Sequence, residues 1–333
     1  MSILFTNSVI SARSSKMLDA DRIRRMIHAN TIEDTTKILF EMDYDLSEDD
    51  IINPSDAIIT NELKRFVKEF GELCPSDDLL YVVLGRFYYH NAAAFYNARL
   101  RNPDDAKASS TVDSVYPFGN DYLEPVMLRS AIYRKSYINL PDAMALTLRK
   151  LDDIASPSPF MVDLEFNRAL YADIFTKLKP IKNRHIKQYF RAEIDLLNLR
   201  TYAKLRFAGN IPSDIYIEGG EISEESLNTI FEKNLRNSKV AFMGLNYDAV
   251  IAELMIGLEN ANLVRFENTS NNFLIELSKE GSDDIFSLSM LFGWFIAKME
   301  ELRIVKTILI GKKFGKSRDE LREDLRGIIE FGG

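Results

Sequence analysis

Cysteine and histidine are almost absent from the sequence. Cys74 is the single cysteine among 333 residues, so an internal disulfide is excluded and a reducing compartment is favoured. The three histidines are His28, His90 and His185. None has a His or Cys partner at the spacing of a zinc site, so we expect them to be packed or surface residues rather than metal ligands.

Residues that break helices are also scarce. Glycine and proline number 15 and 10, well below the average usage of about 12% for the pair. Those present cluster between long runs of helical periodicity, and no long stretch alternates polar and apolar residues as a strand would. The sequence therefore predicts an all-α protein.

Long apolar runs and excess positive charge are missing as well. The most apolar stretch, 287–297, is shorter than the roughly 20 residues of a membrane span. The apolar N-terminal run stops at Thr6 without a basic region, so we expect no secretory signal. With 42 basic and 50 acidic residues the formal net charge is −8, which argues against a nucleic-acid binder. We expect a globular cytoplasmic protein, too long for one core and so built of several subdomains.

The sequence offers no complete catalytic motif. The segment 311–317 resembles a phosphate-binding loop, but three residues separate its glycines where that loop needs four. It is better interpreted as a helix end with cationic residues. Adjacent aspartates do not extend to the DDxxD pattern of diphosphate-using enzymes, and Cys74 has no obvious base. We therefore expect neither a catalytic site nor a cofactor.

Three long helices are predicted, at 77–101, 181–207 and 285–310. They align as copies of one another. Tyr88 and Asn91 in the first helix correspond to Asp195 and Asn198 in the second, 107 residues later, and Asp195 corresponds to Glu301 in the third, 106 residues later. Basic residues follow at equal distances near the three helix ends, where the helix dipole favours them: Arg99, Arg206 and Lys312.

This period predicts three helical repeats, 1–115, 116–218 and 219–333.

Polar residues inside the long helices have two interpretations. They either hydrogen-bond in the interior and fix helix pairing, or face a central opening or a partner. The residues concerned are Asn91, Asp195, Asn198 and Glu301.

A cation-rich stretch runs from Lys306 to Arg326, across the end of the third long helix and beyond it. It is either a surface that touches an acidic partner or a solvated helix end, and the sequence favours neither. The candidate partner-contact residues are Lys312, Lys313 and Lys316.

Four motifs in this order resemble the C-subunit family of the A/V-type rotary ATPases, whose eukaryotic counterpart is the V-ATPase d-subunit family. They are Ser-Ala-Arg at 11–13, Ile-Asp-Leu-Leu-Asn at 194–198, Gly-Gly-Glu-Ile-Ser at 219–223, and a tail from Glu301-Leu302-Arg303 through Gly311-Lys312 to Glu320-Leu321-Arg322. Two departures are Tyr88, where the family pattern has Asp, and Ile304, where it has Asn.

The resemblance implies three helical subdomains around a pseudo-threefold axis, forming a funnel. It implies a non-catalytic socket of the central stalk, which joins the D/F-type shaft subunits to the membrane proteolipid ring. The socket would couple ATP hydrolysis to proton or sodium transport, or ion flow to ATP synthesis, and sit on the membrane through the ring. Two alternatives stay open: a generic helical adaptor of another complex, and a helical diphosphate-using transferase.

Overall fold

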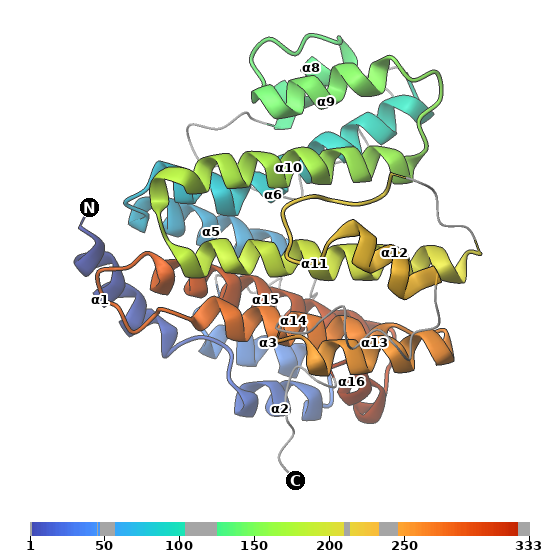
Figure 1. Cartoon of the computed structure of the whole chain (residues 1–333). Helices are drawn as coiled ribbons and strands as arrows, with labels where there is room; N and C mark the ends of the chain where they lie inside the picture. The colour runs from blue at the N-terminus through green and yellow to red at the C-terminus, as the bar shows by residue number, and fades with distance from the viewer. Residues whose placement is uncertain are drawn as a thin grey trace. The chain divides into compact units, whose positions relative to one another are not determined.

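The structure, a computed structural model, describes residues 2–44, 46, 57–103, 125–209, 214–232 and 246–325. Every regular element within these ranges is an α-helix, which confirms the predicted all-α class (Figure 1). No helix in this part of the chain combines the length and apolarity of a membrane span.

The long helices lie close to their predicted positions. The first, α6 (Asp77–Arg101), has the predicted bounds. The second, α11 (Arg184–Phe207), starts three residues later than predicted, because α10 (Pro159–Ile181) ends there and Lys182 takes a left-handed conformation with φ of 52°. The third, α15 (Ser289–Lys313), is shifted toward the C-terminus.

The shift of α15 is caused by a contact with the N-terminal helix. The side-chain amide of Asn7 donates to the carbonyls of Ile285 (2.8 Å) and Ser287 (3.1 Å), which holds this segment in a non-helical connection. Asn7 lies on α1 (Ile3–Ser14). A contact with a residue 278 positions away cannot be read from local periodicity.

Side-chain oxygens cap several helix starts. Thr31 accepts from the Asp34 amide and begins α3 (Ile32–Glu41). Ser317 and Glu320 form a capping box at α16 (Arg318–Asp324). The remaining helices are α2 (Ala20–His28), α5 (Ala57–Leu73), α8 (Pro125–Tyr133), α9 (Asp142–Asp152), α12 (Glu224–Glu232), α13 (Asp248–Asn260) and α14 (Val264–Lys279).

The chain forms two compact units. The first comprises residues 63–183 and 217–219, and its main contact is between α6 and α10. Tyr89 packs edge-on against Phe166 across this contact. The hydroxyls of Tyr81 and Tyr89 both donate to the carboxylate of Asp173, which ties the two helices by polar bonds as well as by burial.

The second unit comprises residues 2–62, 184–216 and 220–333. In it α14 lies against both α11 and α15 (Figure 1). Tyr189 and Phe190 of α11 contact Phe292 of α15 with ring centroids 4.9 and 5.7 Å apart. These rings form the aromatic centre of the unit.

The division into three repeats and the funnel shape stay predictions. The expected boundary between residues 115 and 116 lies outside the described residues.

We expect Phe292→Ala to lower the free energy of unfolding of the second unit by about 3–5 kcal/mol, because it leaves a cavity among buried rings. Trp294 is the single tryptophan and lies in this unit, so its fluorescence during urea unfolding reports this unit alone. Phe286→Ala is the control, since Phe286 is 67% exposed. Equal midpoints for the two variants would contradict the packing described here.

Candidate functional site

The four polar residues predicted inside the long helices are all buried. Asn91 lies on α6 in the first unit, and its Nδ2 has no hydrogen-bond partner within the described residues. Asp195 and Asn198 on α11 and Glu301 on α15 belong to the second unit. The two carboxylates, each 3% exposed or less, have well-defined partners.

Asp195 holds the connector that precedes α12. Its carboxylate accepts the backbone N–H of Glu221 (3.0 Å) and of Ile222 (2.9 Å), and the hydroxyl of Tyr247 (2.9 Å). Burial raises the pKa of Asp195 above its usual value, although these three donors oppose the shift.

Gly220 allows this approach. A Cβ added at Gly220 would lie 2.1 Å from Asp195 Oδ1, closer than any real contact. The Gly-Gly-Glu-Ile-Ser motif found in the sequence therefore has a physical reason: a side chain at the second glycine would displace the carboxylate from the N–H groups that follow.

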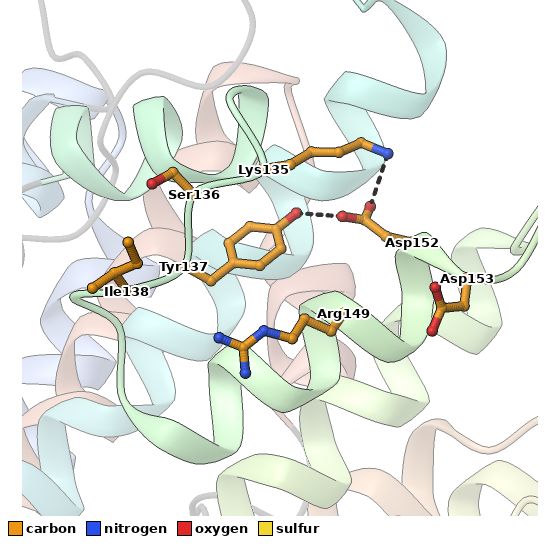
Figure 2. Close-up of a pocket in the computed structure, with 7 residues that line it drawn as sticks. All are labelled: Lys135, Ser136, Tyr137, Ile138, Arg149, Asp152 and Asp153. Carbon is orange, nitrogen blue, oxygen red and sulfur yellow. Dashed lines mark hydrogen bonds and ion pairs between the residues drawn. The ribbon is translucent and has the colours of Figure 1, made fainter.

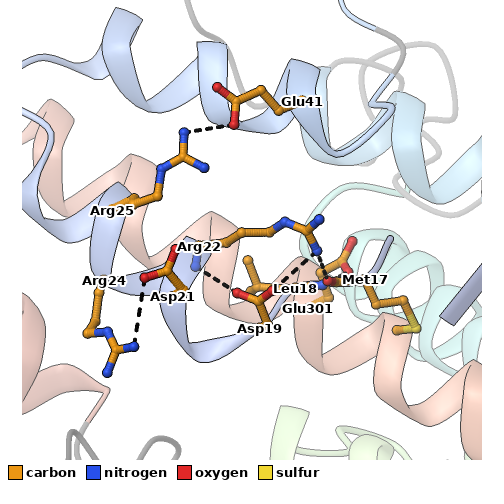
Figure 3. Close-up of polar contacts among 9 residues, drawn as sticks. All are labelled: Met17, Leu18, Asp19, Asp21, Arg22, Arg24, Arg25, Glu41 and Glu301. Atoms are coloured by element: carbon orange, nitrogen blue, oxygen red, sulfur yellow. Dashed lines mark hydrogen bonds and ion pairs between the residues drawn. The ribbon is translucent and has the colours of Figure 1, made fainter. Parts of the chain in front are cut away.

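Glu301 holds the segment that precedes α2 in the same manner. Its carboxylate accepts the backbone N–H of Leu18 and the hydroxyl of Tyr44, each at 2.8 Å. Figure 3 shows Met17 and Leu18 beside Glu301, with the Met17 carbonyl bound by Arg22 of α2. The N-terminal segment is thereby fixed to the third long helix.

A buried ammonium group balances this carboxylate. Lys298 Nζ lies 2.5 Å from Glu301 Oε1 and 2.8 Å from Glu62 Oε1, and 4.6 Å from the centre of the Tyr44 ring. An isolated buried charge is costly, whereas paired charges with hydrogen bonds are tolerated. Sequence analysis missed Glu62, Lys298, Tyr44 and Tyr247, and only Lys298, one turn before Glu301, lay close enough in the chain to be noticed.

The aligned basic residues near the helix ends also have partners. Arg99 donates to the carboxylate of Asp152, the Ile132 carbonyl and the Tyr137 hydroxyl. Burial alone would raise the pKa of Asp152, but hydrogen bonds from Tyr137 and Arg99 lower it below the usual value. Burial raises the pKa of Tyr137 to about 12.

A pocket of about 370 Å³ opens beside this cluster, lined by residues 135–138 and by Arg149, Asp152 and Asp153. Figure 2 shows the Tyr137 hydroxyl and the Lys135 ammonium both directed at Asp152. Asp152 therefore acts as the acceptor of a structural network, and its oxygens are engaged by four side chains: Tyr96, Arg99, Lys135 and Tyr137.

The three candidate partner-contact cations differ in their surroundings. Lys312 Nζ donates to the carbonyls of Ala29 (2.6 Å) and Ile27 (3.2 Å). Burial and the nearby charge of Arg318 lower the pKa of Lys312. Lys316 pairs with Asp324 at 2.7 Å, and Lys313 is exposed.

The loop-like segment 311–317 is a helix end, as predicted. Helix α15 continues through Gly311 to Lys313, and Gly315 follows with φ of 72°. Within the residues that the structure describes, no group of three or more His, Cys, Asp or Glu side chains is arranged to hold a metal ion.

These features define an all-α protein whose buried polar side chains fasten connectors to long helices. A family model for the ATP synthase (C/AC39) subunit matches residues 6–324. The chain belongs to this family, which confirms the resemblance seen in the sequence.

Two relatives match over almost their whole length. The C subunit of the V-type sodium ATPase of Enterococcus hirae is 20% identical over 332 residues, covering 98% of each chain. The C subunit of the A-type ATP synthase of Haloquadratum walsbyi is 21% identical over 337 residues, covering 96% of this chain and 97% of the relative. The corresponding A-type ATP synthase protein of Halorubrum lacusprofundi is 25% identical over 48% of this chain and 47% of its own length.

We expect Asp195→Asn and Asp152→Asn to show opposite pH dependence. The folded-state pKa of Asp195 is raised, so its ionisation removes stability as the pH rises from about 4 through that pKa. The loss of unfolding free energy caused by Asp195→Asn is thus largest in acid. Trp294 fluorescence during urea unfolding measures it.

The folded-state pKa of Asp152 is lowered, so its contribution is complete above about pH 4 and is lost as the pH falls through the folded pKa. The defect of Asp152→Asn therefore shrinks in acid. Cleavage within residues 125–153 by an acid protease measures it. Parallel pH profiles for the two variants would contradict the assignment.

Proposed function

We propose that this chain is a non-catalytic subunit of a V/A-type ATPase, placed between the D/F-type central-stalk subunits and the membrane proteolipid ring. In this role it transmits rotation, either for ATP-driven proton or sodium transport or for ATP synthesis. It binds no nucleotide and lies on the cytoplasmic side of the membrane through its contact with the ring. The family match over residues 6–324 is the observation that carries the proposal.

The build of the chain supports this role. A part that transmits torque must resist twisting, and its helices α6, α10, α11 and α15 have 23 to 25 residues each. Such helices are about 35–38 Å long. Buried polar bonds fix them at defined points, because a carboxylate that moved away from its donors would lose several hydrogen bonds together.

We expect removal of this chain from the complex to separate ATP hydrolysis from ion movement. The head retains its nucleotide sites and continues to hydrolyse ATP, whereas membrane vesicles lose ATP-driven ion uptake. Adding back the purified chain restores uptake. ATP hydrolysis is measured by phosphate release and transport by an ion-sensitive dye. Coupled transport that persists without the chain would refute the proposed function.

The exposed cation Lys313 is the sharpest test of the proposed partner contact. Its neighbour Lys312 is engaged with backbone carbonyls, so a change there would disturb the fold as well. We expect Lys313→Glu to lower recovery of the intact complex, because it opposes an acidic partner surface, while the Trp294 unfolding midpoint stays unchanged.

Lys306→Glu is the matched control, with the same charge change on the exposed side of the same helix. Both variants are measured by pull-down of the stalk and ring subunits. Equal recovery with the two variants would show that Lys313 makes no such contact.

A further inference from the structure

Three short helices, α2, α8 and α12, receive the basic residues at the ends of the long helices. In each, the acceptor is a backbone carbonyl. The pairs are Arg99 with Ile132, Arg206 with Phe231, and Lys312 with Ile27.

Two of these contacts are between neighbours in the sequence. Arg99 reaches 33 residues forward to α8, and Arg206 reaches 25 residues forward to α12. Lys312 instead reaches back 285 residues to α2. The contact of α2 with α15 is therefore equivalent to the contact of α8 with α6 and to that of α12 with α11.

The buried carboxylates provide an independent comparison of α2 with α12. Leu18, whose N–H binds Glu301, lies nine residues before Ile27. Ile222, whose N–H binds Asp195, lies nine residues before Phe231. A tyrosine hydroxyl also donates to each carboxylate: Tyr44 to Glu301 and Tyr247 to Asp195. In both α2 and α12, the residue that donates to the buried carboxylate precedes the residue that accepts from the basic side chain by the same number of positions. This shared spacing matches α2 with α12.

Helix α16 adds further contacts at the end of α2. Arg318 donates to the His28 carbonyl (3.0 Å) and to Asn30 Oδ1 (2.9 Å), and Arg322 lies 2.9 Å from His28 Nε2. Gly311 permits this arrangement, because a Cβ there would lie 2.4 Å from Leu321 Cδ2. The C-terminal end of α2 is thus held by cations from both α15 and α16.

We propose that the N-terminal segment is a latch, in which α2 docks on α15 and α16 so that the two ends of the chain complete one structural module. The latch opens by releasing residues 17–41 together, without unfolding α11 or α12. Lys312 is its central positioning residue. This inference does not depend on the proposed function.

Hydrogen exchange on the full chain, followed by mass spectrometry, tests the latch. Lys312→Met removes two charge-assisted hydrogen bonds, so we expect exchange within α2 and α3 to rise about tenfold while α12 stays protected. Arg206→Met should raise exchange in α12 and leave α2 and α3 unchanged. Lys313→Met is the matched control, expected to alter neither.

Two results would overturn the proposal. One is exchange in α2 and α3 that is the same for Lys312→Met and Lys313→Met. The other is a rise across α11 and α12 as well, which would show global loosening of the unit. Lys312→Arg, which keeps a donor at this position, should restore most of the protection even where Lys312→Met folds poorly, and failure to do so would equally count against the latch.

Discussion

Buried carboxylates on the long helices are the constraint on which much of the second unit depends. A charged group without partners in the interior costs several kcal/mol, so each carboxylate must be supplied with donors. Glu301 obtains them from Leu18, Tyr44 and Lys298, and Asp195 from a connector and a tyrosine. Hydrophobic burial is non-directional, whereas these bonds accept only one position of the connector along the helix. They therefore select the register in which helices and connectors meet.

Local sequence properties predicted the helices well. Scarcity of glycine and proline and the period of 3.6 residues located α6 to the residue and the other two long helices within a few residues. The start of α15 was wrong because Asn7, from the other end of the chain, binds the carbonyls before it. Asp195 and Glu301 were identified because they are polar residues at corresponding positions inside predicted long helices. Their partners were not, since nothing local to Tyr44 or Tyr247 indicates which distant carboxylate it binds.

The basic residues at the helix ends show a different limit. Their spacing was visible in the sequence, and the dipole of their own helix explained it. In the structure each reaches a backbone carbonyl of another helix or of its cap. For Arg99 and Lys312 this carbonyl lies at the C-terminal end of that helix, where the same dipole effect operates between helices rather than within one. Adjacent residues on a helix point about 100° apart, so Lys312 and Lys313 face different surroundings. Charge counts along the chain treat them alike, and only coordinates separate an engaged cation from an exposed one.

The proposed coupling of two moving parts makes particular demands on such bonds. Replacing a buried ion pair with apolar side chains often leaves stability unchanged or increased, so the cluster of Glu62, Lys298 and Glu301 need not add stability. What it adds is a defined position: apolar side chains can repack after a small shift, whereas an ammonium between two carboxylates cannot shift without leaving a charge unpaired. In the proposed role of carrying torque, resistance to small displacement matters more than the total free energy of unfolding. On this argument, evolution would retain polar residues inside these helices even though an apolar interior would fold as readily.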